Sequence, residues 1–153
     1  MTGAGHTVIR PAAATDWPAI RALLEAAALP LDGARENLAD FIVAQQDGTV
    51  VGCAGLERHG DAALLRSCAV DARLRGSGIG RALTTRAIER ARQAGLHQLV
   101  LLTTTAGDFF ARFGFMRITR ADAAESLRSS AEFQHACPAS AVVMRLDLPP
   151  LEK

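Results

Sequence analysis

The sequence predicts one α/β (α+β) domain built on a mixed, mostly antiparallel central sheet of about six to seven strands flanked by helices. The chain has 153 residues, a length that suits a single domain with a sizeable core. Segments with strand and helix patterns alternate along it, and two tight turns in its first half favour antiparallel pairing. No repeat, low-complexity tract or linker divides the chain, so residues 1–153 are expected to form one domain.

The N-terminal part predicts one strand and two helices. Thr7–Arg10 has strand character, and Thr15 is expected to cap the helix that follows. A second, short helix is expected over Leu31–Leu38. The first helix has one apolar stripe with i, i+3, i+4, i+7 spacing, formed by Ile20, Leu23, Leu24 and Ala27.

The middle of the chain predicts an antiparallel meander. Asp40–Gln46 and Thr49–Glu57 flank the dipeptide Asp47-Gly48, a strong hairpin signal. A second turn at 59–61 leads into a strand over Ala62–Val70. Histidine 59 is assigned to this turn.

The second half predicts alternating helices and strands. A helix is expected from about Gly78 to Ala94, with its inner face formed by Leu83, Ala87, Ile88 and Ala91, and with Gly95 as its C-terminal cap. The remaining expected elements are a strand over His97–Thr103, a helix over Ala106–Phe113, a strand over Phe115–Thr119, a helix over Asp122–Phe133 and a strand over Ala141–Leu148.

The composition excludes several classes of protein. Lys+Arg 17 against Asp+Glu 16 gives a formal charge of +1, whereas a general nucleic-acid binder carries a basic excess. The first residues lack a signal-peptide pattern, and no run approaches the roughly 20 apolar residues of a membrane span. Cys53, Cys68 and Cys137 are widely spaced, which favours neutral thiols over a disulfide or metal site. These features predict a cytoplasmic protein with no nucleic-acid, membrane or metal partner.

The stretch RLRGSGIGRAL at 73–83 has the character of a phosphate-binding loop. Gly76, Gly78 and Gly80 allow close approach to the main chain, and the helix that follows adds its N-terminal dipole. Arg75 and Arg81 add positive charge beside the loop. A P-loop needs GxxxxGK[ST] and a dinucleotide fingerprint needs GxGxxG, and the GxGxG spacing here fits neither.

These residues resemble a known family. Arg73–Gly78 matches the R/Q-x-x-G-x-G/A signature of the GNAT N-acetyltransferases, and FFARFGF at 109–115 resembles the second signature of that family. The order of elements is also similar, so the resemblance implies the GNAT fold, with a sheet splayed at the cofactor site, and acetyl-CoA as cofactor. The cofactor-binding residues that it implies are Cys68, Ala69, Val70, Arg75, Gly76, Ser77, Gly78, Ile79, Gly80, Arg81, Phe109 and Phe110.

The resemblance also implies where catalysis occurs. A main-chain N–H of the strand segment Cys68–Val70 is expected to polarise the thioester carbonyl, which places Cys68 and Ala69 among the catalytic residues. Glu57, near the end of the preceding strand, is the first candidate for the base that takes a proton from the amine. An exposed hairpin glutamate is the alternative interpretation of this residue.

One residue type common in the family is missing. The chain contains no tyrosine, and alignment on AxxFxxxxGF puts Thr103 and Phe110 where the family often has asparagine and tyrosine. Water or a hydroxyl such as Thr104 is therefore expected to protonate the departing thiolate.

Longer strings resemble a narrower group. Residues 51–57, 60–70, 101–115 and 129–144 are similar to acetyltransferases encoded with arsenic-resistance genes, and in part to the acetyltransferase domain of N-acetylglutamate synthases. Both imply an amino-acid acceptor with an acidic side chain, such as arsinothricin, phosphinothricin or glutamate. The substrate-binding residues expected for it are Arg66, Thr104, Arg128 and His135, with Ser140 in the same segment.

The sequence therefore favours an acetyl-CoA-dependent N-acetyltransferase that acts on the α-amino group of a glutamate-like amino acid, with a homodimer as the expected assembly. Two alternatives remain open. One is acetylation of glutamate itself or of another ordinary amino acid. The other is an acyl-CoA-binding regulatory domain without turnover, which the missing tyrosine favours.

Overall fold

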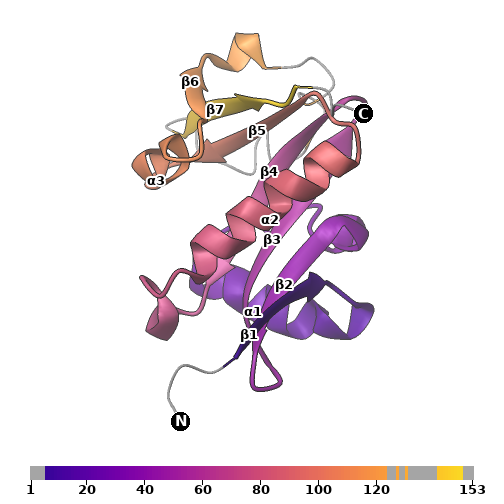
Figure 1. The fold of residues 1–153 in the computed structure, drawn as a ribbon, viewed down its shortest axis with the longest axis vertical. Helices are drawn as coiled ribbons and strands as arrows, with labels where there is room; N and C mark the ends of the chain where they lie inside the picture. The colour runs from indigo at the N-terminus through magenta and orange to yellow at the C-terminus, as the bar shows by residue number, and fades with distance from the viewer. Residues whose placement is uncertain (1–5, 124–126, 128–129, 131–140, 150–153) are drawn as a thin grey trace. The chain divides into compact units, whose positions relative to one another are not determined.

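The computed structural model describes residues 6–123, 127, 130 and 141–149. The chain divides into two compact units, one of Met1–Gly55 with Ser67–Ala87 and the other of Leu56–Arg66 with Ile88–Lys153. Each unit is described separately below, with its elements labelled in Figure 1.

A seven-stranded mixed sheet with the strand order β1-β2-β3-β4-β5-β7-β6 forms the framework of the described residues. The β4–β5 pairing is parallel, whereas β1–β2, β2–β3, β5–β7 and β6–β7 are antiparallel. The strands are β1 (Thr7–Pro11), β2 (Phe41–Gln46), β3 (Thr49–His59), β4 (Ala62–Val70), β5 (Gln98–Thr103), β6 (Met116–Ile118) and β7 (Val142–Asp147). The expected mixed, mostly antiparallel sheet is confirmed.

Helices and short helical turns connect the strands. The α-helices are α1 (Trp17–Ala26), α2 (Ile79–Gln93) and α3 (Gly107–Ala111). The 3-10 turns are η1 (Ala14–Asp16), η2 (Arg35–Asp40), η3 (Ala72–Leu74) and η4 (Arg120–Asp122). The second helix expected near Leu31–Leu38 is thus a 3-10 turn that begins later, and most of the helix expected over Asp122–Phe133 lies outside the described residues.

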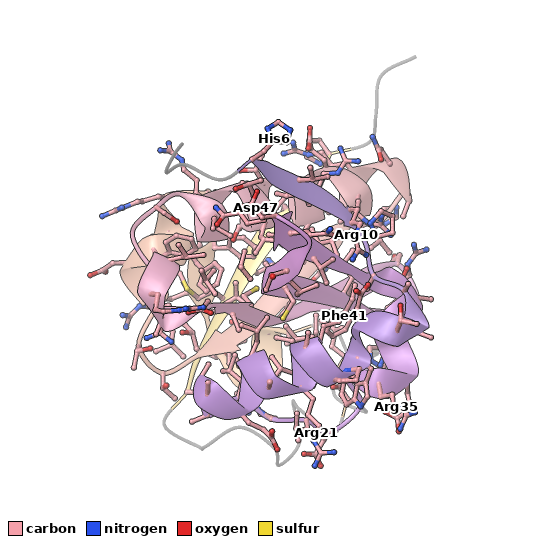
Figure 2. The ribbon with its side chains drawn as sticks, turned by 90° about the horizontal axis from the view of Figure 1, so that it is seen from below. His6, Arg10, Arg21, Arg35, Phe41 and Asp47 are labelled. Atoms are coloured by element: carbon pink, nitrogen blue, oxygen red, sulfur yellow. The ribbon has the colours of Figure 1, made fainter. Side chains whose placement is uncertain are left out.

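In the first unit, α1 packs on the sheet through its predicted apolar stripe. Ile20 and Leu24 are fully buried and share a core cluster with Phe41, Val43 and Cys53. Figure 2 shows Phe41 on the side of the sheet where α1 lies, and Arg21 on the outward side of that helix. The β2–β3 hairpin closes at Asp47-Gly48, where both residues have positive φ, +48° and +81°, as predicted for this dipeptide.

The entry into α1 differs from the sequence prediction. Thr15 does not cap the helix, since it lies inside the turn η1. Asp16 holds this turn instead: its carboxylate accepts hydrogen bonds from the Ala13 N–H (2.7 Å) and from two Arg10 nitrogens (2.8 and 2.9 Å). The hydrogen bond from Arg10 lowers the pKa of Asp16 despite its burial. The start of α1 therefore depends on Arg10 of β1, a contact that the local sequence pattern does not reveal.

The second unit has its own core along β4, β5 and β7. β5 and β7 pair over six residues, whereas β4 and β5 pair only through Ala62–Leu64 and Gln98–Val100. Leu65 and Arg66 on β4 lie beyond that paired segment. The buried cluster consists of Ala62, Leu64, Val100, Ala123, Leu127 and Val143.

Helix α2 confirms the pattern predicted for it. Its inner face is formed by Leu83, Ala87, Ile88 and Ala91, all of which are buried. Gly95 follows its last turn with φ +77°, the left-handed conformation of a C-terminal cap glycine.

The first testable prediction concerns Gly55 of β3. A Cβ added there would lie 2.2 Å from Cε1 of the fully buried Phe41, so the ring has to move. Gly55→Ala is expected to lower the free energy of unfolding by about 1–3 kcal/mol, as overpacked cores do. Urea denaturation followed by circular dichroism measures the change.

Gly107→Ala is the matched control. The nearest atom to its added Cβ, Nη2 of Arg117, is 3.7 Å away, an ordinary contact, and Gly107 is helical. The stability of this variant should stay the same or rise slightly. Equal losses of stability in both variants would contradict the packing argument.

Candidate functional site

The glycine loop between β4 and α2 has the backbone conformation that its sequence requires. Gly76 and Gly78 have φ of +83° and +94°, where side chains other than glycine are strained. No heavy atom lies within 4 Å of the Cβ position of either residue, so the space beside the main chain is open. The third glycine, Gly80, lies in the first turn of α2.

The loop leads directly into a long helix. α2 has 15 residues and begins at Ile79, so its first backbone N–H groups and its positive dipole end lie at the end of the loop. Arg75, Ser77 and Arg81 are exposed around it. This combination of bare backbone, helix N-terminus and cationic side chains suits an anion such as a pyrophosphate.

The first arginine of the motif has a structural partner. The Arg73 side chain donates from Nη2 to Oδ2 of Asp71 at 3.0 Å, and its backbone N–H donates to Oδ1 of the same carboxylate at 3.0 Å. Asp71 is in turn fixed by its own N–H, which donates to Val51 O at 2.8 Å. Hydrogen bonds from Arg73 lower the pKa of Asp71 to about 2. Arg73 therefore shapes the turn before the loop.

Strand β4 has an irregular backbone immediately before Cys68. Ser67 has φ +59°, an unusual value for a residue other than glycine inside a strand. The Cys53 thiol donates to the Ser67 carbonyl at 3.2 Å and helps to hold this conformation. Burial raises the pKa of Cys53 to about 12, so this thiol stays neutral. This irregular residue directly precedes Cys68, Ala69 and Val70, the segment expected to contact the thioester.

Glu57, the candidate base, lies in a buried network of charged groups in the second unit. Its Oε1 accepts a hydrogen bond from Nη1 of Arg66 at 2.8 Å, and its Oε2 lies 2.5 Å from Nε2 of His59. The side chains of Glu57 and Arg66 are 8% and 0% exposed. Glu57 is therefore not the exposed hairpin residue of the alternative interpretation.

The environment of Glu57 keeps its carboxylate ionised. Burial by itself raises the pKa of Glu57, but hydrogen bonds from His59 and Arg66, together with the Arg66 charge, outweigh it. The pKa of Glu57 consequently lies below its ordinary value. Glu57 is thus charged at neutral pH, and both of its oxygens are engaged.

Thr103, at the end of β5, and Phe110, in α3, both make contacts that stabilise the local structure. The Thr103 hydroxyl accepts a hydrogen bond from the Ala106 N–H at 2.9 Å, so this threonine closes the turn before α3. Phe110 is buried, with Phe109 and Phe115 against its ring at centroid distances of 5.1 and 5.9 Å. Thr104 is exposed.

The expected site residues are therefore distributed over both units. The cofactor residues Cys68–Val70 and Arg75–Arg81 belong to the first, whereas Glu57, Arg66, Thr104, Phe109 and Phe110 belong to the second. Arg128, His135 and Ser140 lie outside the described residues, as does Cys137. The roles assigned to all of these residues stay predictions.

His59 belongs to β3 and not to the turn predicted for it. Its i, i+2 spacing from Glu57 on a strand places both side chains on the same face of β3, and this spacing is the sequence signal for their contact.

The described part of the chain contains no group of three or more His, Cys, Asp or Glu side chains able to hold a metal ion. None of the helices described has the length and apolar character of a membrane span.

Comparison with known proteins identifies the family. Residues 37–117 match the acetyltransferase (GNAT) domain model. An amino-acid acetyltransferase of Mycobacterium tuberculosis is 36% identical over 121 residues, covering 72% of this chain and 69% of that protein. One from Neisseria meningitidis is 31% identical over 129 residues, covering 78% of this chain and 30% of that protein. The chain thus spans about 30% of the length of the first relatives that it matches.

Solved structures agree with this result. A Mycobacterium tuberculosis protein solved in complex with CoA has a TM-score of 0.81 at 31% identity, over 93% of this chain and 99% of that one. N-acetylglutamate synthase from Neisseria gonorrhoeae, solved with coenzyme A and N-acetyl-glutamate, has a TM-score of 0.81 at 25% identity, over 96% of this chain and 36% of that one. The expected family and fold are confirmed, and the chain belongs to the GNAT family of acetyltransferases.

Proposed function

We propose that this chain transfers the acetyl group of acetyl-CoA to the α-amino group of a small amino acid with an acidic side chain. The observation that carries the proposal is the loop Arg75–Ile79, in which two glycines hold left-handed conformations beside open space at the start of α2. The CoA present in similar solved structures supports acetyl-CoA as the donor. Residues 1–153 are proposed to act as one catalytic domain.

The proposed cofactor site uses the first unit. Backbone N–H groups of Gly76–Gly80 bind the pyrophosphate, with Arg75 and Arg81 adding charge. The main chain of Cys68–Val70, which follows Ser67 with its positive φ, contacts the pantetheine arm and the thioester. A fixed N–H donor aimed at the carbonyl oxygen stabilises the negative charge that develops there when the amine attacks.

The proposed acetyl transfer is direct. The amine nitrogen attacks the thioester carbon, a tetrahedral intermediate forms, and the C–S bond breaks to release CoA thiolate. Phe110 occupies the position where the family often has tyrosine, and its ring is packed among Phe109 and Phe115. Solvent or the exposed Thr104 is therefore proposed to protonate the thiolate.

The proposed acceptor is glutamate-like. The names of the relatives, amino-acid acetyltransferases, favour an amino acid. Beside glutamate, we propose arsinothricin and phosphinothricin as specific acceptors. Only the resemblance of residues 51–57, 60–70, 101–115 and 129–144 to other acetyltransferases supports these two. Arg66, Thr104, Arg128 and His135 are proposed to contact the acceptor. Of these, Arg66 is already paired with Glu57, so its charge acts on the acceptor only together with that carboxylate.

The function is tested by a screen of acceptors. Release of CoA from acetyl-CoA is measured with each α-amino acid and with arsinothricin and phosphinothricin. We expect release with glutamate or one of its analogues and little with cationic or aromatic amino acids. Failure to release CoA with any amine, although acetyl-CoA binds, would favour a binding domain without turnover.

The cofactor site is tested at Gly78. Gly78→Glu puts a negative charge where the pyrophosphate is proposed to bind, and we expect the Kd for acetyl-CoA to rise at least about 100-fold, equivalent to roughly 2.7 kcal/mol. Isothermal titration calorimetry measures the affinity, and thermal unfolding measures the effect on the fold.

Gly95→Glu is the matched control for that variant. Gly95 has a similar positive φ of +77° and open space at its Cβ position, but it lies after the other end of α2. In both variants a glutamate has to adopt a positive φ, so the free energy of unfolding should fall by a similar amount. If Gly78→Glu and Gly95→Glu bound acetyl-CoA equally well, the assignment of the loop would be wrong.

A further inference from the structure

Gly52, inside strand β3, lacks a side chain for reasons of space. The residue is buried, and its φ is not among the positive values that the glycines of the loop adopt, so its backbone conformation does not itself require glycine. A glycine inside a strand weakens the strand and often marks a point where another segment of the chain approaches closely. Gly52 has the burial and the conformation of such a point.

Three groups approach this position. A Cβ added at Gly52 would lie 2.9 Å from Cδ1 of Leu83, 3.2 Å from the carbonyl oxygen of Ala69 and 3.3 Å from Cγ2 of Ile79. Ala69 belongs to β4, whereas Ile79 and Leu83 belong to the beginning of α2. All three residues are buried. The bare backbone at Gly52 thus lets β4 and α2 pack against the same point of β3.

β4 and the start of α2 carry the two parts of the proposed acetyl-CoA site. The segment Cys68–Val70 of β4 is proposed to contact the thioester, and Ile79 directly follows Gly78 of the proposed pyrophosphate loop. One pantetheine arm joins the thioester to the pyrophosphate in acetyl-CoA, so both segments have to fit the same molecule at once. Binding groups of this kind have to be held within about 0.5 Å of the productive geometry.

The neighbours of Gly52 on β3 hold the same part of the chain. The carbonyl of Val51 accepts a hydrogen bond from the Asp71 N–H at 2.8 Å, and the thiol of Cys53 donates to the carbonyl of Ser67 at 3.2 Å. Ser67 precedes the segment proposed to contact the thioester, and Asp71 follows it. All of these residues belong to the first compact unit. The middle of β3 is therefore the support on which this segment rests.

We propose that Gly52 is a positioning residue of the acetyl-CoA site, and that it sets the separation between the Ala69 carbonyl on β4 and the start of α2. This inference rests on the proposed function, because it concerns the binding of the donor. It adds to the site a residue that lies outside the glycine loop and that acts through the two elements packed against it.

A methyl group at position 52 has no room unless its neighbours move. Leu83 can turn its terminal Cδ1 away, but the Ala69 oxygen is a backbone atom and moves only with its strand. Closely packed interiors respond to an added methyl group with shifts of the backbone and of side chains. Such a shift here changes the separation of β4 and α2, and with it the fit of acetyl-CoA.

The test measures the binding of acetyl-CoA to Gly52→Ala. We expect its Kd to rise at least about tenfold, equivalent to about 1.4 kcal/mol, because the two parts of the site no longer fit the ligand together. Isothermal titration calorimetry gives the Kd. Circular dichroism and urea denaturation show that the variant is folded under the conditions of the titration and measure its stability.

Gly55→Ala is the matched control, since it adds the same methyl group to the same strand. Its Cβ would meet the ring of Phe41, which belongs to the core cluster beneath α1. This variant should also lose stability, but its Kd for acetyl-CoA should stay within about twofold of the original value. If Gly55→Ala weakened binding as much as Gly52→Ala, a general loss of stability would explain both results and the proposal would be overturned.

A second substitution tests whether the contact itself is the cause. Leu83→Val removes the Cδ1 that lies nearest to the added methyl group, so Gly52→Ala with Leu83→Val nearly conserves the packed volume. The double variant should bind acetyl-CoA at least about threefold more tightly than Gly52→Ala, whereas Leu83→Val alone should stay close to the original Kd. A double variant that regains no affinity would contradict the proposal.

Leu83→Phe tests the same contact from the helix, and it replaces Gly52→Ala if that variant does not fold. The larger ring presses on Gly52 without a change in β3, so the Kd for acetyl-CoA should again rise, and an unchanged Kd would overturn the proposal. An original protein that does not bind acetyl-CoA refutes the proposed function. An original protein that binds it, together with a Gly52→Ala variant that binds it equally well, refutes only the role of Gly52.

Discussion

The buried ion pair between Glu57 and Arg66 is the constraint around which the chemistry of the second unit is organised. Two charges removed from water are tolerated only when they are paired and their remaining donors and acceptors are satisfied, and removal of one partner typically costs about 3–5 kcal/mol. The pair joins β3 to β4 and fixes the carboxylate that contacts His59. Glu57, His59 and Arg66 thus form one group of contacting charged side chains that lie within ten positions of one another.

The fold was predictable where local signals decide it. The Asp47-Gly48 turn, the apolar stripe of α1 and the Gly95 cap follow from single dipeptides or helical spacing, and the structure confirms them. Prediction failed where a distant partner decides: Asp16 replaces Thr15 at the start of α1 because Arg10 reaches it from β1. The contact between Glu57 and Arg66 was missed for another reason: the two residues are only nine positions apart, but their pairing depends on the burial of β3 and β4, which the local pattern does not show. The glycine loop was predictable because its conformation depends on glycine itself.

The two units contain different groups of candidate site residues. The first contains features shared with a broad family, the glycine loop and the irregular strand beside it, and these point to the cofactor. The second contains Glu57, His59 and Arg66, a largely shielded group of contacting ionisable side chains. Phe110, at the position where the family often has tyrosine, has no hydroxyl, and its ring packs against Phe109 and Phe115. The absence of tyrosine from the sequence is consistent with this arrangement.

The contact between Arg73 and Asp71 changes what the family signature means in this chain. The arginine that opens the motif is bonded to a carboxylate two residues earlier, and that carboxylate residue is tied to β3 through Val51. The first position of the signature thus makes an exposed contact within the turn before the loop, while the glycines provide the left-handed backbone and the open space of the loop. Natural variation at the two kinds of position should therefore follow different rules: exchange of the arginine together with Asp71 as a covarying pair, and near invariance of the left-handed glycines whatever their neighbours.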